Sequence, residues 1–331
     1  MFFSIVIPVY NRPQEIEELL ESLTKQHYPS FEVIIVEDGS FKSAKDIVLR
    51  YQDRLDVHYY EKANEGQGFA RNFGFARAKG DYFIVFDSDI LVPEDYLQKV
   101  VTGIQRDGWD AFGGPDAAHS SFTNIQKAIS YSMTSPFTTG GIRGNKQHVG
   151  QFQPRSFNMG ISRGVYEQTN GFKLSRRSED IEFSIRMMEQ GFRVGLIPDA
   201  FVYHKRRATF EQFFKQTYAF GEGRIDIYKL FPQELKPVHA LPAVFVVGLC
   251  GTVLLNLIHW ASLGQVPALS LLCSMGNSLL ILYTVLLFLH AWVTTKSIRI
   301  AGLGVVSAYT QLIAYGLGFI NAYMERVVWR K

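Results

Sequence analysis

The sequence predicts an α/β protein with a mostly parallel, Rossmann-like sheet, followed by an α-helical transmembrane region. The first observation is a series of short apolar runs, each followed by a segment with the period of a helix. The second is the stretch from Val238 to Thr295, which contains no Asp, Glu, Lys or Arg, and a similar run extends from Ile300 to Met324. A transmembrane helix takes roughly 20 apolar residues, so both runs are long enough to cross a membrane.

The composition of the whole chain hides this division. The 331 residues have a mean hydropathy of +0.00 and a net charge of +3, which are values typical of a soluble protein. From Val238 onward, however, there are five basic residues and one acidic residue, so this part carries +4 and the part before it −1. A charge this small does not favour nucleic acid as a partner. Two Cys are too few for a disulfide framework.

Apolar runs in the N-terminal part are continuous rather than alternating, which is typical of parallel strands buried on both faces. We expect strands at 4–9, 31–36, 57–60 and 82–86, and helices at 14–24, 44–51 and 69–78. The N-terminus has no basic region before its first apolar run, so we expect no signal peptide. This part is therefore predicted to stay in the cytosol.

Three domains are expected: an α/β domain over 1–207, an interfacial helix or linker over 208–237, and a membrane domain over 238–331. Candidate spans are about 241–263, 267–292 and 300–323. The segment 211–230 is compatible with a helix in the membrane interface, which we favour, or with two core helices split at 221–223. Basic residues at 296 and 299 fit a cytosolic α/β domain on a multi-pass protein of the cytoplasmic membrane. A third full span would place the basic C-terminus outside, so two or three spans remain open.

Polar residues follow the predicted strands, at the edge where α/β sheets bind ligands. The clearest are Asp87 and Asp89, which can share Mg²⁺ or Mn²⁺ through their carboxylates, although a solvated turn is the simpler interpretation of an isolated Asp-x-Asp. The glycine-rich stretch 66–74 precedes a helix, and its amides together with Arg71 are candidates for binding phosphate.

Two later positions are ambiguous by themselves. Ser178, Glu179 and Asp180 open a helix, so Asp180 or Ser178 is a candidate helix cap, and the alternative is a general base. His204 ends another predicted strand, where a histidine is either structural or a metal ligand.

The segments 4–12, 33–40, 64–89 and 170–204, in this order, resemble family 2 glycosyltransferases with a GT-A fold, and the resemblance covers about residues 1–205. It implies a role for each matching position. Pro8 and Tyr10 would lie at the nucleotide pocket, Asp38 would bind the base, Arg71 would lie near the base and diphosphate, and Asp87 near the ribose. Asp89, with Asp87 and His204, would hold the metal, and Asp180, next to Glu179, would be the catalytic base. Glu37 is a mild departure, since the family often has Asp there.

The resemblance implies an inverting transferase, dependent on Mg²⁺ or Mn²⁺, that moves a sugar from a nucleoside-diphosphate sugar, with UDP as the first expectation. The acceptor would be a hydroxyl of a lipid-linked or envelope glycan, with membrane lipids as further partners. The region 113–171 is expected to shape the acceptor site, with flexible points at 138–141 and Gly144. One alternative is a polyprenyl-phosphate glycosyltransferase. A processive synthase is disfavoured by three spans and by the lack of Gln-x-x-Arg-Trp after His204, and a non-catalytic scaffold by the intact set of acids.

Overall fold

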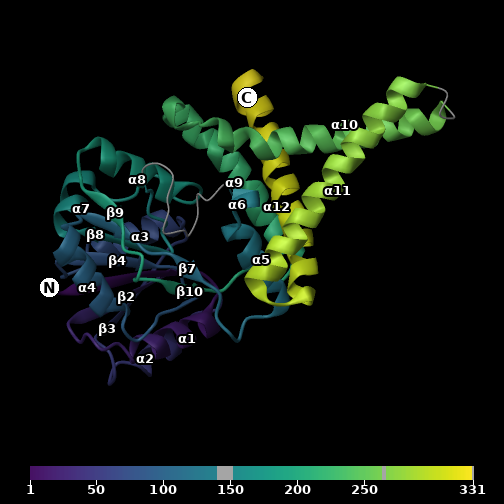
Figure 1. Cartoon of the computed structure of the whole chain (residues 1–331). Helices are drawn as coiled ribbons and strands as arrows, with labels where there is room; N and C mark the ends of the chain where they lie inside the picture. The colour runs from purple at the N-terminus through teal and green to yellow at the C-terminus, as the bar shows by residue number, and fades with distance from the viewer. Residues whose placement is uncertain (140–151, 263–265, 330–331) are drawn as a thin grey trace. The chain divides into compact units, whose positions relative to one another are not determined.

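The computed structural model describes residues 1–139, 152–262 and 266–329, which form two compact units (Figure 1). Unit 1 comprises Met1–Ser120 and the described part of Arg143–Lys205. Unit 2 comprises the described parts of Ser121–Ile142 and Arg206–Lys331. Unit 2 therefore includes part of the range 1–207 that the sequence analysis assigns to one domain. The expected flexible points at Gly140, Gly141 and Gly144 lie outside the described residues.

The main sheet of unit 1 has seven strands, in the order β3-β2-β1-β4-β8-β6-β9. They are β1 (Phe3–Val9), β2 (Phe31–Asp38), β3 (Val57–Lys62), β4 (Tyr82–Phe86), β6 (Ala111–Gly113), β8 (Asn158–Ser162) and β9 (Val194–Leu196). Strands β3, β2, β1 and β4 are parallel, β8 is antiparallel to β4 and β6, and β9 is parallel to β6. The predicted mostly parallel sheet is confirmed.

Helices cover both faces of this sheet. They are α1 (Pro13–Leu23), α2 (Lys45–Leu49), α3 (Gln67–Phe75), α4 (Tyr96–Asp107), α7 (Arg163–Thr169) and α8 (Glu179–Glu189). Successive side chains of a strand point to opposite faces, so Ile5 belongs to a core with Leu20 of α1 and Leu97 of α4, whereas Val6 packs in a second core with Phe75 of α3. Burial on both faces explains why the strands are continuously apolar.

A small sheet beside the main one joins two distant segments of the chain. Its order is β5 (Ile90–Leu91), β10 (Val202–His204), β7 (Asp116–Ala117). His204 pairs with Ile90, and the Lys205 amide donates to the Asp89 carbonyl over 2.9 Å. This pairing brings the end of β10 next to the turn that follows β4.

Unit 2 is helical. It contains α5 (Asn124–Thr134), α6 (Pro136–Thr139), α9 (Phe210–Leu230), α10 (Leu241–Ala261), α11 (Pro267–Thr295) and α12 (Ile298–Tyr323), with short turns η1 (Pro232–Glu234), η2 (Pro237–Ala240) and η3 (Met324–Val328). Three helical stretches are long and apolar enough to cross a membrane: Pro237–Ala261, Pro267–Thr295 and Ile298–Val328. The third is half buried within the unit, whereas the first two expose most of their apolar side chains.

Helix α9 runs unbroken through Gly221-Glu222-Gly223, so the alternative of two helices split there is wrong. The reason is close packing against α12. A Cβ built on Gly221 would lie 2.2 Å from the Tyr315 carbonyl oxygen, and one on Gly318 would lie 2.1 Å from that of Tyr218. Gly221 and Gly318 therefore allow the backbones of α9 and α12 to approach closely, as small residues do between helices of membrane proteins.

Helix α5 joins unit 2 through polar contacts. The hydroxyls of Ser132 and Ser307 are 2.7 Å apart, and the Tyr131 hydroxyl donates to the Leu287 carbonyl over 3.1 Å. These bonds tie α5 to α12 and α11. Apolar packing adds to them, because Ile129 and Met133 lie against Phe213 of α9.

Candidate active site

The loops after β1 and β2 meet at the carboxyl edge of the main sheet. Asn11, at φ 56°, accepts from the amides of Phe41 and Lys42 through its side chain. Pro8 is half-buried in β1, and Tyr10 is half-exposed with its ring edge-on to Phe41. The structure thus places both predicted nucleotide-pocket residues at this edge, with the Tyr10 ring accessible.

Asp38 ends β2 as a buried carboxylate. Its two oxygens accept from the amides of Glu65 and Gly66 over 3.0 and 2.8 Å, and Lys62 Nζ lies 3.1 Å from Oδ1. The carboxylate therefore fixes the start of α3 against the end of β2. Glu37 beside it is also buried and accepts from the Ala44 amide over 2.8 Å.

The glycine-rich start of α3 packs against protein. The Gly66 amide is bound to Asp38, and the Gly68 amide donates to the Ser175 carbonyl over 2.8 Å. A Cβ on Gly68 would lie 2.2 Å from the Leu174 carbonyl oxygen. Of the amides in the stretch 66–74 that are candidates for binding phosphate, those of Gly66 and Gly68 already have partners and are not available. Their role is to bring α3 close to the loop before α8.

Arg71 on α3 connects two acidic positions that lie 92 residues apart in the sequence. Its Nη2 is 2.7 Å from Asp87 Oδ1, and its Nη1 is 2.8 Å from Glu179 Oε1. The guanidinium is buried and lies over the Phe172 ring. A buried charge is costly unless it is paired, so these two carboxylates and Arg71 depend on one another.

Asp87, Asp89 and His204 form the first of two groups with metal-type ligands among the described residues, and their ligand atoms lie within 4.8 Å of one another. The His204 Nε2 is 3.3 Å from Asp89 Oδ1, and its Nδ1 is 3.9 Å from Asp116 Oδ2. Two carboxylates and one imidazole fit Mn²⁺ or Mg²⁺ by ligand type. Asp116 thus lies on the far side of the imidazole from Asp89, beyond hydrogen-bond distance of the Nδ1 atom.

Asp89 is held in its charged form. Burial alone would raise the pKa of its carboxyl, but attraction and hydrogen bonding to His204 and Arg12 outweigh burial and hold the pKa well below its usual range. Arg12 Nη1 lies 2.5 Å from Asp89 Oδ2. Sequence reasoning gave Arg12 no role of its own. The available signal was its place after β1, opposite the end of β4.

The second metal-type group, Glu32, Asp56 and His58, lies at the other end of the sheet strands. Glu32 is the second residue of β2 and His58 the second of β3. The two groups therefore flank opposite edges, and only the Asp87 group shares the edge at which Arg71 and α8 converge.

Glu179 and Asp180 occupy the first turn of α8 and differ in environment. Glu179 is buried and also accepts from Gln67 Nε2 over 2.6 Å. Burial, with repulsion from Asp180, raises the pKa of Glu179 to about 7 despite the attraction of Arg71. Asp180 is partly exposed, bonds the Ile181 amide, and has Arg155 Nη1 at 3.8 Å, a partner that sequence reasoning missed.

Ser178 does not cap α8 through its side chain. It has a left-handed backbone, at φ 58°, and makes no side-chain cap bond. The capping alternative therefore fails for Ser178, and Asp180 is left as a carboxylate at a helix start. Helix starts favour negative charge, so the dipole of α8 favours a carboxylate at this position.

The fold and this edge define a class: an α/β transferase domain of GT-A type. The chain resembles in structure the mannosyltransferase PcManGT from Pyrobaculum calidifontis, solved with GDP-Man and Mn²⁺, with a TM-score of 0.62 over 94% of this chain and 86% of that one, at 18% identity. The model of glycosyl transferase family 2 matches residues 4–169, and the chain belongs to this family.

Two proteins whose sequences match most of this chain are also glycosyltransferases. Glycosyltransferase AglE of Haloferax volcanii is 27% identical over 75% of this chain and 81% of its own length. A dolichyl N-acetyl-α-D-glucosaminyl phosphate 3-β-D-2,3-diacetamido-2,3-dideoxy-β-D-glucuronosyltransferase of Methanococcus voltae is 24% identical over 70% of this chain and 78% of its own length. The predictions that the chain is an enzyme, and a glycosyltransferase, are confirmed.

Proposed function

We propose that this glycosyltransferase is a membrane-anchored, inverting enzyme that moves a sugar from a nucleoside-diphosphate sugar, UDP-linked as first choice, to a hydroxyl of a lipid-linked or envelope glycan. The observation that carries the proposal is the connected set at the carboxyl edge: Arg71 binds Asp87 and Glu179, and Asp180 follows Glu179 directly. Donor-side and acceptor-side residues thus share one ion-pair network.

The donor would occupy the edge formed by β1, β2 and β4. Tyr10 has an accessible ring for a base, and Asp38 fixes the neighbouring backbone. Asp87, Asp89 and His204 would hold Mg²⁺ or Mn²⁺. A divalent ion at this place neutralises charge on a departing diphosphate. Glu179 positions Arg71, whose guanidinium would stabilise the same charge from the protein side.

Asp180 would act as the general base. In a single displacement, the acceptor oxygen bonds to the anomeric carbon while the bond from that carbon to the phosphate oxygen breaks. The acceptor proton passes to the Asp180 carboxylate, and the nucleoside diphosphate leaves with the electron pair. A hydroxyl acceptor needs such a base, whereas a phosphate acceptor is already ionised near neutral pH. The position of Asp180 therefore favours a hydroxyl over a polyprenyl phosphate as nucleophile.

The apolar helices would anchor the enzyme in the cytoplasmic membrane. If α10 and α11 both cross it, Lys296 and Arg299 return to the side on which the chain enters, in agreement with the tendency of basic residues to remain in the cytosol. The catalytic unit would then face the cytosol, where nucleotide sugars are made. The printed activity of the Methanococcus relative, on a dolichyl-linked sugar phosphate, supports a membrane acceptor.

The test is a donor screen with the purified full chain in nanodiscs, measuring release of nucleoside diphosphate from UDP- and GDP-sugars, with and without membrane lipid extract. We expect release from one donor class, stimulated by the extract and lost in excess chelator. The Asp180→Asn chain should bind that donor without transfer. Absence of release from every donor, or transfer that is unaffected by Asp180→Asn, would contradict the proposal.

A further inference from the structure

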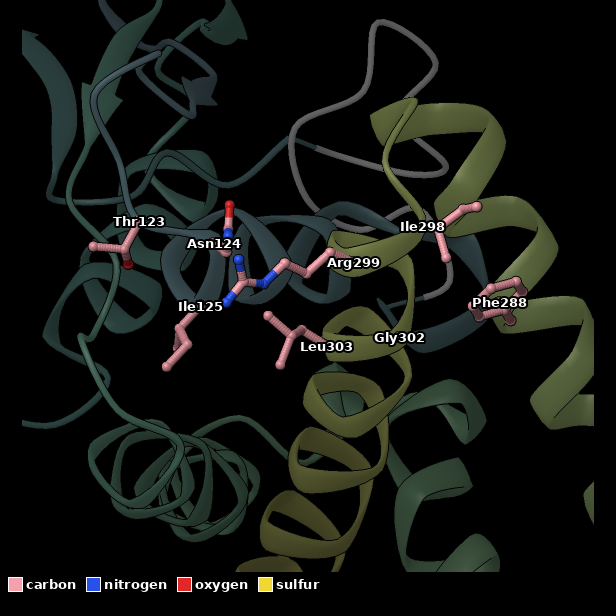
Figure 2. Close-up of a pocket in the computed structure, with 8 residues that line it drawn as sticks. All are labelled: Thr123, Asn124, Ile125, Phe288, Ile298, Arg299, Gly302 and Leu303. Carbon is pink, nitrogen blue, oxygen red and sulfur yellow. The ribbon is translucent and has the colours of Figure 1, made fainter.

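Unit 2 contains a groove of about 600 Å³ between the start of α5 and the adjoining ends of α11 and α12 (Figure 2). Its walls are mainly apolar and include Ile125, Phe288, Ile298 and Leu303. All of its lining residues belong to the same unit. The groove is therefore a feature of the helical unit itself.

Among the described residues that line the groove, Arg299 is the one cation. Figure 2 shows the Arg299 side chain extending from α12 toward Asn124 and Ile125 on α5. Arg299 is exposed, and within the described part of the chain it has neither an ion pair nor a hydrogen bond. Arg326 at the other end of the α12 stretch, in contrast, is paired with Asp226 and Glu222. The described lining includes no acidic side chain, so its charge complements an anion.

Two helix starts add to the positive potential. Helix α5 begins after Thr123, whose hydroxyl caps the Gln126 amide, and α12 begins after Ser297, which caps the Ile300 amide. Residues of both first turns line the groove. The start of a helix carries a partial positive charge, and phosphates commonly bind there.

The groove lies at the ends of two candidate membrane spans, which is where a lipid headgroup would be located. Arg299 follows the polar break at Lys296 and Ser297, while Leu303 and Phe288 lie within the apolar helices themselves. A ligand here would have a charged end at the membrane surface and an apolar length beside it. The α5 side of the groove follows Ser120, a residue of the catalytic unit, by only a few positions in the chain.

We propose that this groove binds the polyprenyl-phosphate end of the lipid-linked acceptor, with the phosphate on Arg299 and the first isoprene units along the apolar wall. The inference rests on the proposed function, because it names where the carrier of that acceptor is held. One charged end and one apolar length match a lipid with a single hydrocarbon chain better than a phospholipid with two.

Gly302 offers a way to fill the groove. It lines the wall, and a Cβ built on it would meet nothing within 4 Å. Gly302→Leu therefore places a side chain in open space without a backbone clash. Gly251→Leu on α10 is the matched control, since a Cβ there also meets nothing within 4 Å and Gly251 does not line the groove. Lys296→Gln is the control for Arg299→Gln.

The experiment is photo-crosslinking of the full chain, in phosphatidylcholine nanodiscs, with a diazirine-bearing farnesyl phosphate. We expect labelling on α5, α11 and α12 that is displaced by unlabelled farnesyl phosphate. A charged hydrogen bond contributes roughly 1.5–3 kcal/mol, so Arg299→Gln should weaken labelling by about tenfold or more. Gly302→Leu should weaken it comparably, and both control variants should label as the native chain does.

Three outcomes would overturn the inference: labelling unaffected by both groove variants, equal displacement by farnesol, or equal displacement by phosphatidylglycerol, which would indicate a general anionic-lipid site. Donor-dependent release of nucleoside diphosphate by the native chain is measured in parallel. If release is absent but groove labelling behaves as expected, the proposed function fails and the lipid site stands. If release occurs without groove labelling, only the inference fails.

Discussion

The two units differ in the kind of side chain that they bury and the kind that they expose. Unit 1 buries charged groups at its ligand edge, where Arg71, Glu179 and Asp89 are almost inaccessible and each has a partner of opposite charge. Unit 2 exposes apolar side chains, such as Leu279 at 66% and Ile281 at 64%, on helices with few charges. A mean hydropathy of +0.00 is therefore the average of one unit rich in charged residues and another with long apolar helices.

The largest effect should come from Asp180, the partly exposed carboxylate that follows Glu179 at the start of α8. Asp180→Asn removes a base without removing volume, so transfer should fall by roughly 10²–10⁴, while donor affinity changes little. Donor titration and product formation on the purified chain measure the two separately. Glu189→Gln, at the exposed end of the same helix, is the control and should retain full activity. Equal loss in both variants would indicate damage to α8 rather than loss of a base.

The next effect concerns the metal-type group. Asp89→Asn removes one predicted ligand and the partner of Arg12 and His204. We expect Mn²⁺ affinity, followed by electron paramagnetic resonance, to fall at least tenfold, and activity to fall with it. Asp95→Asn, at a partly exposed position before α4 whose carboxylate pairs with Lys99, should bind Mn²⁺ as the native chain does. Full activity of the native chain in excess chelator would remove the metal from the mechanism.

The contrast between the units also predicts where one substitution is costly. Leu279→Arg places a charge on the exposed face of α11, and a charge near the centre of a membrane helix costs roughly 2.5–3.5 kcal/mol to insert. Membrane-inserted protein should decrease in an alkaline extraction assay. Leu49→Arg on α2 is also on an exposed position, at 45%, yet should leave insertion and melting temperature unchanged. If both behaved alike, unit 2 would not have lipid as its solvent.

Strand and helix positions in unit 1 were predictable because their signals are local. The apolar run at 4–9 and the helix at 14–24 match β1 and α1 within one or two residues. Charge-free stretches likewise marked the three apolar helices. Acidic residues after β4 and at the start of α8 were found because each stands out from its own neighbours in the sequence.

Pairings across the chain were not predictable in the same way. Nothing near Arg71 in the sequence indicates that it lies between Asp87 and Glu179, and nothing near Arg12 indicates Asp89. The glycines of α9 indicated a helix break when taken alone, whereas their function depends on the backbone of α12. Local patterns predict elements, but these partners exist only once the fold has formed.

The smallest effect concerns the raised pKa of Glu179. Its ordinary pKa is 4.5, and its pKa in the folded chain is about 7, so between these values the folded state binds more protons than the unfolded state. Stability from this group is therefore lost as the pH rises from about 4.5 to about 7. Glu179→Gln cannot ionise, so its melting temperature should rise relative to that of the native chain across this window.

The expected relative gain is at least about 2–4 °C, which is the shift that 1 kcal/mol produces in a domain of about 150–250 residues. Differential scanning fluorimetry at pH 4.5 and 7.5 measures it, with Glu189→Gln as the exposed control on the same helix. Asp180→Asn should reduce the effect, because repulsion from Asp180 is one cause of the raised pKa. If the melting temperatures of the native chain and Glu179→Gln changed with pH in parallel, Arg71 would keep Glu179 ionised throughout this range. The pKa of Glu179 would then not be raised, and the prediction would be wrong.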